Sequence, residues 1–310
     1  MSTFKSYLSL IRFSHTIFAM PFAMIGFFLG VAELTYWDRT GAIASGGQGW
    51  HVTDWRMDYF LFKFVLVILC MVFARSAAMA FNRWLDVKFD ALNPRTAIRE
   101  IPAGIISKNS ALRFVAVNCV LFILSTWFIN PLCFLLSFVA LAVVLGYSYT
   151  KRFTPLCHLV LGLGLSLAPI GAYLAVAGRF AWLPILFSLT VIFWVGGFDI
   201  IYALQDEEFD RTQQLYSMPS WLGKAKALRV SEILHLLSTA CVVTAGIYGG
   251  FGCWYWAGVA VFIGMLIYQH SIVKPGDLSR VNLAFMTANG IASVVFAGLV
   301  IADLYWYAHI

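Results

Sequence analysis

Charged residues are scarce in this sequence: only 12% of the 310 residues are Asp, Glu, Lys or Arg, whereas 61% are hydrophobic. A soluble domain carries roughly 25% charged residues. A water-soluble fold of this length could not bury so much apolar surface. The composition therefore excludes a soluble protein and indicates that the solvent around most of the chain is lipid.

Several common site signatures are also missing. The six cysteines form no CxxC pair, and no spacing of His and Cys suggests zinc. No GxxxxGK[ST] or GxGxxG loop for nucleotide phosphates occurs. Because every cysteine lies in or beside an apolar segment, we interpret the cysteines as small packing residues.

What the chain has in abundance is long apolar segments. A membrane-spanning helix needs about 20 mostly apolar residues. The sequence predicts an all-α polytopic membrane protein, residues 1–310 forming one domain with nine transmembrane helices bundled around a central cavity. The nine segments lie at about 13–34, 59–81, 111–129, 131–149, 156–177, 182–204, 230–249, 251–273 and 283–304. The first is too long for a cleavable signal and lacks a clear cleavage site.

The basic residues are distributed unevenly between the two sides of this predicted bundle. With nine spans, one side receives most of the Lys and Arg, and the other receives only Arg39, Arg56 and Arg179. Basic residues accumulate in cytoplasmic loops, so we predict a cytoplasmic N-terminus, an outside C-terminus and a location in the cytoplasmic (inner) membrane. The net charge of +6 thus reflects topology rather than nucleic-acid binding. The basic residues on the predicted cytoplasmic side are Lys5, Arg12, Arg83, Lys88, Arg95, Arg99, Lys108, Arg113, Lys151, Arg152, Arg211, Lys224, Lys226, Arg229, Lys274 and Arg280.

Two acidic clusters stand out in the long cytoplasmic loops. The first is Asn82-x3-Asp86-x3-Asp90, whose members share one face of a helix because they are four residues apart. Two carboxylates one turn apart repel each other, and Mg²⁺ is a natural partner because it prefers oxygen ligands and binds together with substrate phosphates. Arg75 projects from the same face, about two turns deeper, where a charge is costly and indicates function.

The second cluster is Asp199-x2-Tyr202-x3-Asp206-x3-Asp210, again at the cytoplasmic end of a predicted helix. Asp86 and Asp90 are each separated from their counterparts Asp206 and Asp210 by 120 residues. This offset predicts a duplicated four-helix unit, spans one to four and five to eight, with a ninth helix added. Membrane proteins often place a site at the interface of such repeats.

Basic residues between the clusters supply the complementary charge. Arg95 and Arg99 follow the first cluster, and Lys151-Arg152 closes the fourth predicted span. Carboxylates with Mg²⁺ plus Arg and Lys are suited to holding a diphosphate. A substrate with a diphosphate head and an apolar tail would fit the membrane edge and the bundle interior at once. Arg75 could then hold an anionic aromatic acceptor through a bidentate contact.

These motifs resemble those of the UbiA superfamily of intramembrane prenyltransferases, and the resemblance is collinear over nearly the whole chain. The stretch Phe13–Pro21 is similar to the members that act in futalosine-type menaquinone synthesis. One departure is Arg83, which stands where many members carry an Asp and lowers the local negative charge. The residues that carry the resemblance are Asn82-x3-Asp86-x3-Asp90, Arg95-Thr96-x2-Arg99, Pro102-x-Gly104, Tyr147-x3-Lys151-Arg152, Gly162, Gly164, Pro169 and Asp199-x2-Tyr202-x3-Asp206-x3-Asp210.

The resemblance implies Mg²⁺-dependent transfer of a polyprenyl group from its diphosphate to an aromatic acceptor in quinone synthesis. The implied acceptor is 4-hydroxybenzoate or a related hydroxyaryl carboxylate, with 1,4-dihydroxy-6-naphthoate as the alternative. We expect Asp86, Asp90, Asp206 and Asp210 to act through Mg²⁺. The candidate diphosphate ligands are Asn82, Arg99, Lys151 and Arg152, and the candidate acceptor ligands are Arg75, Tyr202 and Asp199.

Three other classes of function are compatible with parts of this pattern. An ion- or proton-coupled transporter would explain intramembrane charge and an internal repeat. A lipid-phosphate hydrolase would need a nucleophile or a His acid near the clusters, and a structural membrane protein would need no site. The discriminating feature is whether the two acidic clusters face each other across one cavity.

Overall fold

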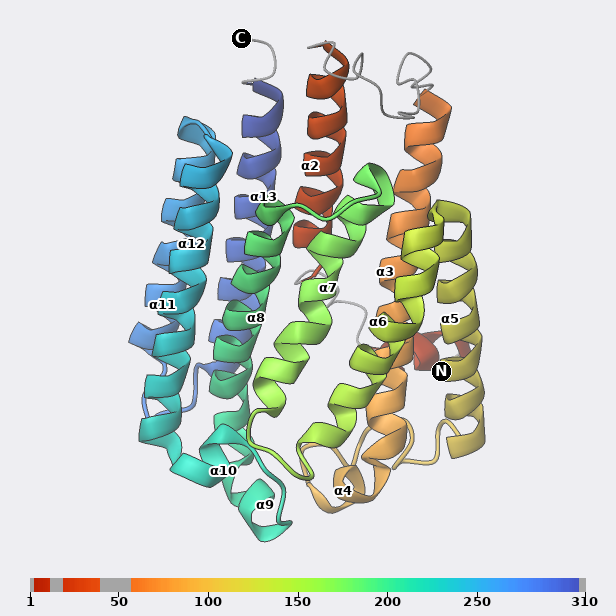
Figure 1. Cartoon of the computed structure of the whole chain (residues 1–310). Helices are drawn as coiled ribbons and strands as arrows, with labels where there is room; N and C mark the ends of the chain where they lie inside the picture. The colour runs from red at the N-terminus through yellow and green to blue at the C-terminus, as the bar shows by residue number, and fades with distance from the viewer. Residues whose placement is uncertain (1–2, 12–18, 40–56, 307–310) are drawn as a thin grey trace.

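The computed structural model describes residues 3–11, 19–39 and 57–306, and long helices dominate these ranges (Figure 1). Each of the nine predicted spans overlaps one helical segment, the first of them over its described part, which begins at residue 19. These segments are α2 (Met20–Arg39), α3 (Met57–Leu85), α5 (Lys108–Ile129), α6 (Pro131–Thr150), α7 (Cys157–Ala177), α8 (Trp182–Ala203), α11 (Lys224–Gly249), α12 (Cys253–Ile272) and the π-helical η5 (Leu283–Ala288) continuing into α13 (Asn289–Trp306).

Within the described ranges, eight of these helices are long and apolar enough to cross a membrane, and α2 contributes a shorter apolar stretch, Met20–Leu34. Large apolar side chains such as Trp127, Leu135 and Ile247 are 61–71% exposed on the outer surface. Such exposure would be unfavourable in water and is expected in lipid. The predicted all-α polytopic fold is confirmed. Residues 40–56, between the first two predicted spans, and most of the Phe13–Pro21 stretch lie outside the described residues.

Local signals set several helix ends. The side chain of Ser107 caps α5 by accepting a hydrogen bond from the amide of Ser110, so α5 begins three residues before the predicted span. Asn130 caps α6 in the same way, with Pro131 in the first turn. Gly178 ends α7 in the left-handed conformation, at φ 66°.

Close helix packing centres on α7, which lies between α2, α6 and α8. A Cβ at Gly26 of α2 would lie 2.0 Å from the carbonyl oxygen of Pro169 on α7, and one at Gly162 of α7 would lie 2.4 Å from that of Ile192 on α8. Small residues let membrane helices approach this closely. These contacts fix α7 against its neighbours and position the side chains near its N-terminal end.

The short helices gather at one end of the bundle. Figure 1 shows α4 (Val87–Leu92), α9 (Glu207–Thr212) and α10 (Met218–Leu222) together at that end, which is opposite the end where α13 reaches its C-terminus. The first acidic cluster leads into α4, and the second runs from α8 through η4 (Leu204–Asp206) into α9. The fold therefore brings two sequence-distant clusters to the same end. A further short helix, α1 (Thr3–Leu10), packs beside α3.

Candidate active site

Both acidic clusters line one polar cavity at this end of the bundle. Its wall combines carboxylates with Arg, Lys, Asn and Tyr side chains from segments that are far apart in the sequence. The predicted site residues in the wall are Arg75, Asn82, Asp86, Asp90, Arg99, Lys151, Asp199, Tyr202, Asp206 and Asp210. The shared cavity is the feature that separates a diphosphate site from unrelated acidic helix ends.

Contrary to the sequence prediction, the first cluster does not lie on one continuous helix. Helix α3 ends at Leu85, and Asp86 lies at the junction with α4 in a non-helical conformation, φ −89° and ψ 7°. The backbone amide of Asp86 still donates to Asn82, and that of Asp90 to Asp86, at 2.9 and 2.8 Å. The one-turn spacing is thus kept while the chain bends, so both carboxylates reach the cavity.

Asp86 is buried, and two cations neutralise it. Nζ of Lys151 lies 3.2 Å from Oδ2 of Asp86, and Nη2 of Arg152 lies 3.2 Å from Oδ1. A buried carboxylate needs such partners because desolvation disfavours its charge. Burial also disfavours the charged Lys151, but Asp86, with Asp210 and Asp90 beyond it, more than offsets this and raises the pKa of Lys151. Arg152, unlike the other predicted ligands, contacts Asp86 from outside the cavity wall.

Asp90 is held by Arg99 in a similar way. Nη1 of Arg99 donates to both carboxylate oxygens of Asp90, at 2.8 and 2.9 Å. Both side chains line the cavity, and the hydroxyl of Thr96 donates to the backbone carbonyl of Asp90 at 3.0 Å. The loop after α4 therefore folds back onto the first cluster and presents its Arg side chains to the cavity.

Arg95 joins the loop after the first cluster to the second cluster, a role that was not assigned to it from the sequence. Its Nε and Nη2 meet the two carboxylate oxygens of Asp206 at 3.2 and 2.5 Å, while Nη1 donates to the hydroxyl of Tyr202 at 3.2 Å. Asn93 also donates to Asp206, at 3.3 Å. Burial disfavours the charge of Arg95, but Asp206 and Tyr202 more than offset this and raise its pKa. The fork geometry is typical of Arg–carboxylate recognition.

The departure at position 83 has a structural explanation. Arg83 is buried and forms a salt bridge with Glu100, which also accepts a hydrogen bond from Ser9. The positive charge that replaces an Asp in the motif is therefore matched by a carboxylate of its own. Arg83 therefore reduces the negative charge of the neighbouring acidic cluster less than the sequence suggested.

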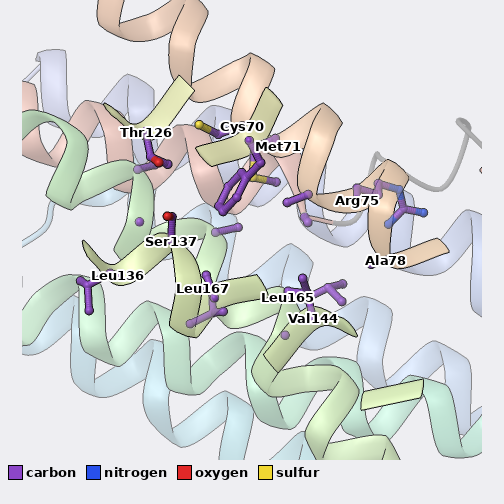
Figure 2. Close-up of a pocket in the computed structure, with 18 of the residues that line it drawn as sticks. Cys70, Met71, Arg75, Ala78, Thr126, Leu136, Ser137, Val144, Leu165 and Leu167 are labelled. Atoms are coloured by element: carbon purple, nitrogen blue, oxygen red, sulfur yellow. The ribbon is translucent and has the colours of Figure 1, made fainter. Parts of the chain in front are cut away.

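A second, mostly apolar cavity adjoins the polar one. Figure 2 shows Arg75 at one end of it and Cys70, Met71, Leu136 and Leu167 further along. Helices α3, α5, α6 and α7 supply most of the wall. The residues shared by the walls of both cavities are Arg75, Met79, Tyr147, Leu161 and Leu165. The two cavities thus meet at Arg75, whose buried Nε has no hydrogen-bond partner in the described part of the chain.

His158 is a further residue of the polar cavity wall, and it belongs to none of the sequence motifs. It lies near the start of α7, and its Nδ1 is 2.7 Å from Oδ2 of Asp199 on α8. No spacing along the chain indicates this pairing, because it arises from the packing of two helices. Tyr202, one turn further along α8, packs its ring against Phe285 of η5, with the centroids 4.3 Å apart and the ring planes tilted by 34°. Such π-helical turns are frequent at functional sites.

The donor set suits Mg²⁺ only in combination with a phosphate ligand. No group of three or more His, Cys, Asp and Glu side chains that could hold a metal occurs among residues 3–11, 19–39 and 57–306. Mg²⁺, however, usually takes one or two carboxylates and completes its shell with water and substrate phosphates. Asp86 with Asp90, and Asp206 with Asp210, offer such partial sets of oxygen ligands on one cavity. The residues therefore fit Mg²⁺ that binds together with a diphosphate.

Comparison with known proteins gives consistent results. The UbiA prenyltransferase family matches residues 19–291. A 4-hydroxybenzoate octaprenyltransferase of Nitrosomonas europaea is 30% identical over 241 residues, which cover 78% of this chain and 82% of that protein. The apo structure of a UbiA homologue from Aeropyrum pernix K1 has a TM-score of 0.76 and 30% identity, covering 93% of this chain and 98% of that one. A UbiA homologue from Archaeoglobus fulgidus bound to DMAPP and Mg²⁺ has a TM-score of 0.71 at 20% identity, covering 97% and 99% of the two chains.

Proposed function

Since this chain belongs to the UbiA prenyltransferase family, we propose that it transfers a polyprenyl group from a polyprenyl diphosphate to 4-hydroxybenzoate or a related hydroxyaryl carboxylate. The observation that carries the proposal is the single polar cavity shared by both acidic clusters, which opens into an apolar cavity at Arg75. The name of the Nitrosomonas europaea relative supports the acceptor. The DMAPP and Mg²⁺ bound to the Archaeoglobus fulgidus homologue support the donor and the ion.

The polar cavity would hold the diphosphate head. Lys151 and Arg99 line this cavity and stay close to Asp86 and Asp90, so they can move onto phosphate oxygens over a short distance. Arg95 and Asn82 provide further donors on the wall. Mg²⁺ bound by the Asp carboxylates and the diphosphate would neutralise its charge and make it a better leaving group.

The apolar cavity would hold the prenyl tail and exclude water from the reacting carbon. Departure of the diphosphate from an allylic carbon leaves a delocalised cation, which nearby π-faces can stabilise. Tyr147 and Tyr202 lie in the wall of the polar cavity, and Tyr147 also belongs to the apolar one. The acceptor ring must lie within a few ångströms of that carbon, which places it near Arg75 where the cavities meet.

The orientation in the membrane follows from charge. We place the end with α4, α9 and α10 on the cytoplasmic side because the loops at this end carry most of the Lys and Arg residues. The diphosphate head would then bind at the cytoplasmic surface while the tail extends toward the bilayer interior.

The proposed function is tested by a transfer assay with purified protein in lipid. The protein is incubated with geranylgeranyl diphosphate or a longer donor and Mg²⁺, with 4-hydroxybenzoate or 1,4-dihydroxy-6-naphthoate, and products are identified by mass spectrometry. We expect prenylated 4-hydroxybenzoate that disappears with EDTA. Prenylated naphthoate alone would correct the acceptor, and failure of the diphosphate to bind would overturn the proposal in favour of a transporter.

A substitution in the apolar cavity tests the placement of the tail. Gly171 lies in the cavity wall, and a Cβ there would meet no atom within 4 Å. It is 13 residues along α7 from His158, roughly 20 Å deeper at 1.5 Å per residue. Gly171→Phe is expected to slow transfer from long polyprenyl diphosphates and spare geranyl diphosphate, which does not reach this depth.

The matched control is Gly264→Phe on α12, an exposed glycine whose Cβ would also meet open space. This variant introduces the same side chain outside the cavity, so its rates with short and long donors are expected to equal those of the wild type. Equal loss of activity with both donor lengths in Gly171→Phe would contradict the placement of the tail.

A further inference from the structure

A hydrogen bond between His158 and Asp199 orients the Asp199 carboxylate. Nδ1 of His158 lies 2.7 Å from Oδ2 of Asp199, and the His158 side chain is 4% exposed, against 24% for Asp199. The two residues sit on α7 and α8, which pack in close contact at Gly162. Both residues line the polar cavity, and His158 is the more buried partner.

A second hydrogen bond determines which nitrogen of His158 carries the proton. The backbone amide of Met218, the first residue of α10, lies 3.2 Å from Nε2. An amide N–H can only donate, so Nε2 accepts and is unprotonated. The proton of the neutral ring is therefore on Nδ1 and is donated to Asp199. The contact with α10 fixes the tautomer and the orientation of the ring.

Asp199 differs electrostatically from three of the four motif carboxylates that lie nearer the end of the bundle. Asp86, Asp90 and Asp206 each form a salt bridge with Lys or Arg, whereas in the described structure the charged-group contact of Asp199 is with His158. Asp199 lies seven residues before Asp206, about 10 Å deeper along the helix. Its Oδ1 makes no hydrogen bond within the described ranges. A carboxylate that accepts one hydrogen bond from a neutral imidazole is a better proton acceptor than one paired with Lys or Arg.

The position of Asp199 coincides with the proposed site of the acceptor ring. Asp199 shares the polar cavity wall with Arg75 and Tyr147, which are two of the residues that also line the tail cavity. The proposed reaction requires a proton acceptor at this point, because the ring carbon that forms the new bond must lose its hydrogen. Neither Lys151 nor Arg99, as cations, can take up that proton.

We propose that Asp199 accepts the proton released by the aromatic ring and that His158 is the positioning residue that holds it; this inference rests on the proposed prenyl transfer. In the reaction, the C1–O bond of the donor breaks and its electron pair leaves with the diphosphate. An electron pair of the ring forms the new carbon–carbon bond ortho to the hydroxyl. The electrons of the ring C–H bond then restore aromaticity, and the proton passes to Oδ1 of Asp199.

Three variants and an isotope effect test this assignment. Asp199→Asn removes the base, and general-base catalysis contributes about 10²–10⁴-fold to a rate. His158→Leu removes only the orienting hydrogen bond and is expected to cost about 10- to 100-fold, the range found for residues that orient a functional group. His158→Asn places an amide donor close to the Nδ1 position, so it is expected to recover most of the activity.

The decisive readout is the single-turnover rate with 4-hydroxybenzoate deuterated ortho to its hydroxyl. In the wild type, proton loss is fast and the isotope effect is expected to be near unity. The isotope effect should rise clearly in Asp199→Asn and His158→Leu, because proton loss becomes rate-limiting. In His158→Asn it should return toward the wild-type value. The KM for the prenyl diphosphate should stay within about twofold in all three variants, since these residues hold no phosphate in this account.

Two results would overturn the inference. If Asp199→Asn and His158→Leu raise only the KM of the acceptor and leave the isotope effect at the wild-type value, Asp199 binds the acceptor without taking its proton. If His158→Asn is no more active than His158→Leu while both melt at the wild-type temperature, the hydrogen bond to Asp199 does not matter. A wild-type protein without transfer activity would instead remove the proposed function itself and this inference with it.

Discussion

Asp86→Asn is expected to lower the rate of prenyl transfer by on the order of 10²–10³-fold, the usual cost of removing one preorganised electrostatic contact from an active site. Asp86 is 3% exposed and is the point where Lys151 and Arg152 converge on the first cluster. The substitution keeps the shape of the side chain and removes its charge. Single-turnover rates at saturating Mg²⁺ and donor measure the effect.

The fold should survive this substitution. The Lys151 and Arg152 side chains are both 33% exposed, so water can solvate them when Asp86 loses its charge. Glu208→Gln is the matched control, because Glu208 belongs to the second acidic run, is exposed and lies outside the cavity wall. Wild-type rates are expected for Glu208→Gln, and wild-type rates for Asp86→Asn would argue against the metal and diphosphate role of the first cluster.

Arg75→Gln is expected to raise the KM for a carboxylated acceptor by roughly 10- to 150-fold, which corresponds to about 1.5–3 kcal/mol for a lost hydrogen bond to a charged group. Arg75 is half-buried at the junction of the two cavities, and its Nε has no partner among the described residues. A cation in the membrane interior is costly, so an unpaired buried donor there indicates a ligand.

The comparison of two acceptors distinguishes this role from a structural one. Phenol lacks the carboxylate, so Arg75→Gln should change the KM for phenol little. The same substitution should strongly raise the KM for 4-hydroxybenzoate. Arg113→Gln, an exposed Arg on α5 outside both cavities, is the control and should leave both acceptors unaffected. An increase in the KM of the prenyl diphosphate instead of the acceptor would place Arg75 at the diphosphate.

The spans could be predicted from the sequence because bilayer thickness fixes their length. The apolar run 59–81 corresponds to α3, Met57–Leu85, and the run 131–149 to α6, Pro131–Thr150. The first acidic cluster was recognisable because four-residue spacing keeps Asp86 and Asp90 one turn apart. The break of the helix at Asp86 was not recognisable, because no helix-breaking residue marks it and the cations that meet Asp86, Lys151 and Arg152, come from the turn after α6. The duplication of a four-helix unit stays a prediction.

Pairings between distant segments escaped sequence reasoning for a physical reason. Periodicity shows which residues share a face of one helix, but it carries no information about which faces meet. Arg95 reaches Asp206 across 111 residues, and His158 reaches Asp199 across 41. Both Arg95 and His158 were visible in the sequence as polar residues on the predicted cytoplasmic side. Only the packing of α7 on α8, and the folding of the loop after α4, gave them partners.

The central claim is that both acidic clusters act on one diphosphate, and a binding measurement tests it most directly. A prenyl thiodiphosphate, which is slow to ionise, is titrated into wild-type protein, Asp86→Asn and Asp206→Asn in lipid, with Mg²⁺ and with EDTA. The account predicts one Mg²⁺-dependent site in the wild type and weakened binding in each variant, because one ligand spans both clusters. Binding that stays at wild-type strength when either cluster is altered, or that does not depend on Mg²⁺, would contradict it.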